Sequence, residues 1–119
     1  MIEIIPTVAD NVVAFRLAGH IEARDFDLAI PQIEEKLRVS SKLRVYVEVD
    51  SFTGISPEAL FKDIQFTLSH FWDFEKEAIV SSEDWLKNLA EFANFVLPHV
   101  EVKHFSLMNK DEALRWVMQ

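Results

Sequence analysis

Few side chains in this 119-residue sequence have the types and spacing that a reaction needs. The serines lack the Gly-x-Ser-x-Gly turn of hydrolases, and the chain has no cysteine to act as a thiolate. Two glycines are too few for a phosphate-binding loop. The histidines are dispersed, without the spacing of metal ligands: His20, His70, His99 and His104. We therefore expect no catalytic residue, metal or cofactor and favour a non-enzymatic protein, with lipid-directed catalysis left open.

Binding of apolar groups is the chemistry that the sequence favours most. Nine of the fourteen aromatic residues lie between positions 52 and 95, on two predicted helices and the loop that joins them. Two short helices need less apolar bulk than this to cover one sheet. The surplus can meet a nonpolar ligand, a membrane surface, a second chain or the other helix, and the sequence does not choose among these.

Composition predicts one globular domain over residues 1–119, since 50% of the residues are hydrophobic and 27% are charged. No apolar run approaches the roughly 18 residues of a membrane-spanning helix, and the N-terminus has no basic region. We expect a cytoplasmic protein, with peripheral membrane contact as an addition. The net charge of −8 argues against nucleic acid and anionic lipid, so membrane contact would depend on apolar insertion.

The first half of the chain predicts a hairpin, a helix and a strand. Residues 2–5 and 12–18 are short β-type runs spaced for an antiparallel pair. Apolar residues then repeat at helical intervals from Phe26 to Leu37, and Pro31 within them predicts a kink or a new first turn. Residues 43–49 alternate between apolar and polar, as in a half-buried strand.

The second half predicts three helices and two strands. Ser56 and Pro57 start a helix that runs to about His70. A weaker strand at 77–80 precedes a capping signature and a helix to Val96, and a strand at 100–105 precedes a closing helix capped by Asn109. The order ββαβαβαβα predicts an α/β fold with a mixed, mostly parallel sheet and an N-terminal antiparallel hairpin.

One face of this sheet is predicted to be only partly covered, because charged residues occupy alternate strand positions. They are Glu3, Arg16, Arg44, Glu48, Glu101 and Lys103. A sheet covered on both faces would instead be apolar throughout. Cross-strand charge pairing at a wet surface is the favoured interpretation, with a polar binding face as the alternative.

Helical wheels leave each of the two aromatic-rich helices with a spare aromatic. In the helix from Pro57, the predicted inward stripe consists of Leu60, Phe61, Ile64, Leu68, Phe71 and Trp72. Phe66 falls on the opposite side. In the next helix, the predicted inward stripe consists of Trp85, Leu86, Leu89, Phe92, Ala93 and Val96. Phe95 falls outside that stripe, so we expect Phe66 and Phe95 to be free to bind.

The element order resembles the SpoIIAA-like fold shared by STAS and CRAL-TRIO domains, and more closely the small bacterial SpoIIAA-like proteins. The segments that carry this resemblance are Leu17-Ala18-Gly19-His20, Asp25-Phe26 with Ile30-Pro31, residues 47–54 before Pro57-Glu58-Ala59-Leu60, residues 70–76 and residues 111–116. These segments span nearly the whole chain. They are not catalytic fingerprints, so they bear on fold more than on function.

The STAS resemblance implies a switch in which a serine before the second helix is phosphorylated to control a partner. The family pattern is Asp-Ser-Ser-Gly, whereas this chain has Asp50-Ser51-Phe52-Thr53-Gly54, which is one residue longer. Phe52 also replaces the second hydroxyl. Ser51 is the acceptor that this resemblance implies, and phosphate there would lie near the positive end of the helix. The alternative is that Asp50, Ser51, Thr53 and Ser56 are turn and capping residues.

The CRAL-TRIO resemblance implies that the two aromatic-rich helices separate to admit a nonpolar compound or to touch a membrane. The leading hypothesis is thus a non-enzymatic domain that binds a nonpolar small molecule or lipid, or associates reversibly with membrane. The predicted ligand-binding residues are Phe61, Ile64, Phe66, Leu68, Phe71, Trp72, Trp85, Leu89, Phe92 and Phe95. The competing hypotheses are the Ser51 switch and a homodimer formed through the same aromatics.

Overall fold

The computed structural model describes residues 1–7 and 9–119. Its elements are β1 (Ile2–Ile5), β2 (Val12–Ile21), η1 (Ala23–Asp25), α1 (Phe26–Leu37), β3 (Leu43–Ile55), α2 (Pro57–Ser69), β4 (Phe74–Val80), α3 (Asp84–Val96), β5 (Glu101–Phe105), η2 (Leu107–Asn109) and α4 (Lys110–Met118). The five strands form one sheet in the order β1-β2-β3-β4-β5. β1 pairs antiparallel with β2, and all other pairs are parallel, which confirms the predicted fold class.

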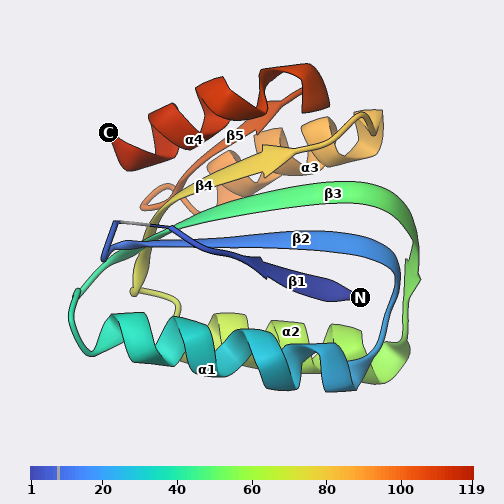
Figure 1. The fold of residues 1–119 in the computed structure, drawn as a ribbon, viewed down its shortest axis with the longest axis horizontal. Coiled ribbons are helices and arrows are strands. Elements are labelled where there is room, and N and C mark those ends of the chain that lie inside the picture. Colours follow the sequence, from blue (N-terminus) through green and yellow to red (C-terminus); the bar gives the residue numbers. More distant parts are fainter. Residues whose placement is uncertain (8) are drawn as a thin grey trace.

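The helices divide between the two faces of the sheet (Figure 1). α1 and α2 lie on one side and α4 on the other. Strand residues Val13 and Phe15 pack in a cluster with α1, and Val49 and Ile79 pack in a cluster with α3. Both clusters share Leu17, so α1, α2 and α3 all belong to the same side of the sheet. We call this side the three-helix face and the opposite side the α4 face.

The α4 face is closed by tight packing. Its core combines small and β-branched strand residues with two fully buried residues of α4, Ala113 and Val117. Phe105 of β5 lies 5.7 Å from the Trp116 ring, measured between centroids. Since protein interiors are packed about as densely as organic crystals, this side leaves little room for another molecule.

Charges on the α4 face pair across strands, as predicted. The Arg16 guanidinium donates to the Glu48 carboxylate at 3.0 Å and lies 3.7 Å from the Glu3 carboxylate. The Tyr46 hydroxyl donates to Glu48 at 3.0 Å, and Arg44 pairs with Glu75 at 2.9 Å. Glu48 is thereby buried with its charge satisfied, at 5% exposure.

Local differences from the sequence prediction lie at the ends of elements. β3 extends to Ile55, so the predicted loop after residue 49 is mostly strand, with irregular pairing to β2 around Gly19. α1 continues through Pro31 without a new first turn. Asn109 occupies the predicted N-cap position of α4, but its side chain makes no capping hydrogen bond, and η2 precedes α4 directly. Ser56, by contrast, caps α2 by accepting from the Ala59 amide at 3.1 Å.

Candidate binding cavity

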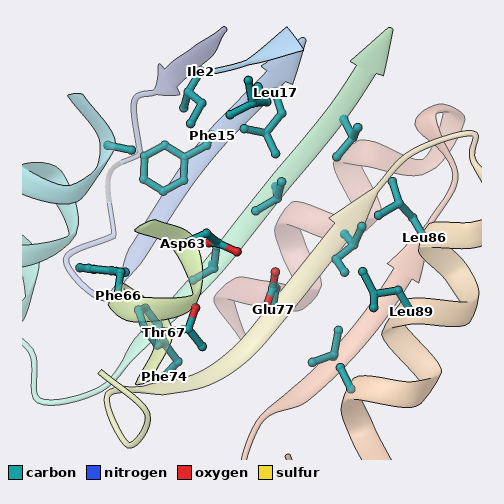
Figure 2. Close-up of a pocket in the computed structure, with 18 of the residues that line it drawn as sticks. Ile2, Phe15, Leu17, Asp63, Phe66, Thr67, Phe74, Glu77, Leu86 and Leu89 are labelled. Atoms are coloured by element: carbon teal, nitrogen blue, oxygen red, sulfur yellow. The ribbon is translucent and has the colours of Figure 1, made fainter. Parts of the chain in front are cut away.

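A cavity of about 510 Å³ lies on the three-helix face, lined by residues of the sheet and of α1, α2 and α3. This volume is within the range of small-molecule sites. Its floor is made by strand residues such as Val45 and Val47, and Ile33 of α1 also lines it. Figure 2 shows Phe15 of β2 and Leu89 of α3 among the lining residues. The lining is predominantly aliphatic and aromatic. The domain therefore has an apolar interior space that its own side chains do not fill.

The position of α2 accounts for this space. α2 packs against η1 and α1, with fully buried Ala59 at its first turn and a 2.8 Å ion pair between Lys62 and Asp27 of α1. These contacts hold the helix beside α1. The space between α2 and the middle of the sheet then remains open, and the cavity extends through it toward α3.

The predicted orientation of α2 is wrong. Much of the apolar stripe expected to face inward is exposed, with Phe61 at 67% and Leu68 at 69%. Phe66, expected to face outward, packs against the core and lines the cavity (Figure 2). A helical wheel ranks faces by hydrophobicity and assumes that the most apolar face is buried. Here the inward positions are instead Ala59 and Phe66, which pack in the core cluster with strand and α1 residues.

The prediction for α3 is partly confirmed. Leu86 is buried, Ala93 is half-buried, and Phe95 is 84% exposed as expected. Phe92 and Val96, expected to face inward, are exposed at 61% and 47%. The buried face of α3 is narrow because small residues such as Ala90 make its closest contacts, which leaves the larger side chains outside.

An aromatic cluster borders one end of the cavity. The His99 ring packs against those of Phe71 and Trp72, with centroid distances of 4.4 and 4.6 Å, and the Phe71 and Trp72 rings are 4.9 Å apart. Nε2 of His99 is 2.8 Å from the Phe71 carbonyl oxygen, and Nδ1 of His70 is 2.8 Å from Asp73. These contacts fix the loop between α2 and β4, so this end of the cavity is well defined.

Two carboxyl groups enter the otherwise apolar cavity, Asp63 from α2 and Glu77 from β4 (Figure 2). Burial, followed by the nearby charge of Asp63, raises the pKa of Glu77 from 4.5 to about 7. Burial also raises the pKa of Asp63. Both shifts have the sign expected where apolar surroundings disfavour the charged form, although Asp63 is exposed and Glu77 is half-buried. The sequence analysis missed both residues, although Glu77 occupies a strand position on the same side as buried Ile79.

The cavity brings together only part of the predicted ligand-binding set. The lining includes Phe66, Phe71, Trp85 and Leu89. The remaining predicted residues lie outside the lining and are mostly exposed: Phe61, Ile64, Leu68, Trp72, Phe92 and Phe95. The floor, made by β2, β3 and β4, was not in the predicted set because its apolar residues are also what an ordinary core requires.

Ser51 lies within β3, six positions before the first residue of α2. It is exposed, has a backbone φ of 57°, and its hydroxyl is 3.3 Å from the Asp50 carboxylate. The helix start itself is capped by Ser56. The prediction that residues 50–53 form the loop into the helix is therefore wrong, and phosphorylation of Ser51 remains a hypothesis.

Within residues 1–7 and 9–119, no cluster of three or more His, Cys, Asp or Glu side chains is arranged to hold a metal ion. No helix in this part of the chain combines the length and apolar character needed to span a bilayer.

The fold and cavity define an α/β domain of the SpoIIAA-like, STAS type. The SpoIIAA-like family model matches residues 12–118, so the chain belongs to this family. An uncharacterized Shewanella loihica PV-4 protein of the DUF3478 family, described as having a SpoIIAA-like fold, is similar with a TM-score of 0.80. The two chains are 24% identical, with 98% of this chain and 92% of the other covered, which supports the fold alone. A search of curated proteins finds no significant match.

Proposed function

We propose that this protein is a non-enzymatic binding domain that holds a nonpolar small molecule between the sheet and helices α2 and α3. The observation that carries the proposal is the apolar cavity of about 510 Å³ on the three-helix face. An unfilled space of this size forgoes the dispersion contacts that a packed core would make. A nonpolar ligand restores those contacts and removes further apolar surface from water.

Binding of Nile red, an uncharged apolar dye, tests the proposal. Thr67 lines the cavity and Leu68, its neighbour on α2, does not. Thr67→Trp places a large ring in the space and is expected to weaken dye binding by about tenfold or more, whereas Leu68→Trp leaves it unchanged. Native mass spectrometry of the purified protein then reports any compound retained from cells. Equal dye binding by both variants contradicts the proposal.

Reversible contact with a membrane is a second candidate, favoured by exposed aromatics beside the cavity. Phe92 and Phe95 of α3 and Trp72 of the α2–β4 loop are all more than 60% exposed. Aromatic side chains are well suited to a membrane interface, and the net charge of −8 favours uncharged lipid head groups. Flotation with phosphatidylcholine vesicles tests this candidate. Phe92→Ser with Phe95→Ser is expected to abolish flotation while leaving Nile red binding intact.

A further inference from the structure

The cavity contains an acidic pair, Asp63 and Glu77, and no lysine or arginine among the described lining residues. Figure 2 shows the two carboxyl groups directed into the space between α2 and the sheet. Neither side chain has a hydrogen bond or ion pair with another described residue, and neither has a carboxyl oxygen that is shut off from solvent. The three-helix face thus presents two acids to whatever occupies the cavity.

The other groups around Glu77 do not neutralise it. The walls formed by α1 and α3 are apolar, and α2 adds Asp63 and the hydroxyl of Thr67. His99, which precedes β5, is the remaining titratable side chain in the described lining, and its Nε2 is engaged with the Phe71 carbonyl. Glu77 is half-buried and Asp63 is exposed, so a positive group that enters the cavity meets two acids and no lysine or arginine of the described lining.

We propose that the ligand is an amphipathic cation, with a protonated amine between Asp63 and Glu77 and an apolar body along the floor of the cavity. This inference rests on the proposed function and adds the chemical class of the ligand. An ammonium group donates three hydrogen bonds and complements both acids. A fatty acid would place a third negative charge beside them, and a neutral alcohol would gain no ionic contact.

The raised pKa values support this arrangement. At pH 6 a large share of Glu77 is protonated, since its pKa is about 7. A bound ammonium displaces that proton, so amine affinity is expected to rise from pH 6 to pH 8. An alkylamine remains protonated throughout, because its ordinary pKa is near that of lysine, about 10.4.

Calorimetric titration of the full chain with decylamine, decanol and decanoate, each below its micelle concentration, tests the inference. These probes share one chain length and differ in the head group. At pH 8 we expect decylamine to bind about tenfold more tightly than decanol, as one charge-assisted contact allows, and decanoate to bind most weakly. The preference for decylamine over decanol is expected to decrease at pH 6.

Charge-removing variants assign the preference to the acidic pair. Glu77→Gln and Asp63→Asn are each expected to reduce the decylamine preference while decanol still binds. Glu91→Gln, on the exposed surface of α3, changes net charge equally and is expected to preserve the preference. The pH profile of the unaltered protein provides a readout that does not depend on how the variants fold.

The outcomes separate this inference from the proposed function. If decanol binds as tightly as decylamine, or if Glu77→Gln with Asp63→Asn keeps the full preference, the cationic ligand class is wrong and the apolar cavity stands. If none of the three probes nor Nile red binds, the proposed function fails as well.

Discussion

Glu48 and Glu77 lie on adjacent strands and point to opposite faces of one sheet, and their surroundings differ. Glu48 on the α4 face accepts hydrogen bonds from Arg16 and Tyr46, each at 3.0 Å. Glu77 on the three-helix face meets apolar walls and the like charge of Asp63. Glu48 on the α4 face is held by partners within the fold, whereas Glu77 on the three-helix face has no hydrogen-bond partner among the described residues.

The two faces of the sheet also differ in how tightly their helices pack against the strands. α4 rests on the sheet through fully buried Ala113 and Val117. α2 instead packs beside α1, and the cavity separates it from the sheet. A sheet with one closed and one hollow side can obtain its stability from the first and keep the second for binding. This division is the physical basis of the proposed function.

The largest expected effect comes from truncating an aromatic on the closed side. Phe105→Ala removes a ring that is 6% exposed and packed against Trp116, and we expect it to cost about 3–5 kcal/mol of unfolding free energy. Leu89→Ala, in the cavity wall, is expected to cost less than about 1 kcal/mol, because its side chain is already 47% exposed. Urea denaturation measures both. Similar costs would show that the two faces are equally packed.

The two glutamates should respond with opposite signs to loss of charge. At pH 8, Glu48→Gln is expected to destabilise the fold by about 1–3 kcal/mol, since it weakens charge-assisted hydrogen bonds to Arg16 and Tyr46. Glu77→Gln is expected to stabilise it by about 1–3 kcal/mol, because it removes a half-buried charge that faces apolar walls and the like charge of Asp63. Denaturation midpoints at constant pH check the signs, and equal signs contradict the contrast between the faces.

The pH dependence of stability sharpens this contrast. The folded pKa of Glu77, about 7, exceeds its ordinary value of 4.5, so the folded state binds the proton more tightly than the unfolded state. The contribution of Glu77 is therefore fully present below pH 4.5 and is lost as pH rises to about 7. Subtracting the stability curve of Glu77→Gln from that of the unaltered protein should reveal a decline in this window. A difference that does not change with pH would contradict the raised pKa of Glu77.

Asp63→Asn is expected to lower the pKa of Glu77 by about one unit or less. The effect is small because burial, rather than the charge of Asp63, is the larger cause of the shift. Carbon NMR titration of the side-chain carboxyl measures it directly. An unchanged pKa would mean that the two acids act independently in the cavity.

The smallest expected effect is at Phe95, which is 84% exposed. Phe95→Ser should change the unfolding free energy by less than about 0.5 kcal/mol, because the side chain packs against little of the fold. Thermal denaturation checks this expectation. A large loss would show that Phe95 is covered by a second copy of the chain, and sedimentation at several protein concentrations would identify that dimer.

The sequence was sufficient to predict the order of the strands and α-helices. Alternation from Leu43 to Val49 predicts β3, and Ser56 with Pro57 predicts the start of α2, since both signals depend on residues close together in the chain. Strand periodicity also places Arg16 and Glu48 on the polar side of their strands. Local chemistry of this kind acts over a few residues and can be read without the rest of the fold.

The rotation of α2 and the presence of the cavity were decided only by tertiary structure. Phe66 faces inward and Phe61 outward because Ala59 and Phe66 pack in a core cluster with residues of β2 and α1, which are distant in sequence. The electrostatic influence of Asp63 on Glu77 likewise depends on how far α2 lies from the sheet. The sequence by itself determined which residues are apolar and which elements they form. Only packing between distant segments determined where those elements leave a space, because a cavity is a property of the gaps between surfaces and not of any one segment.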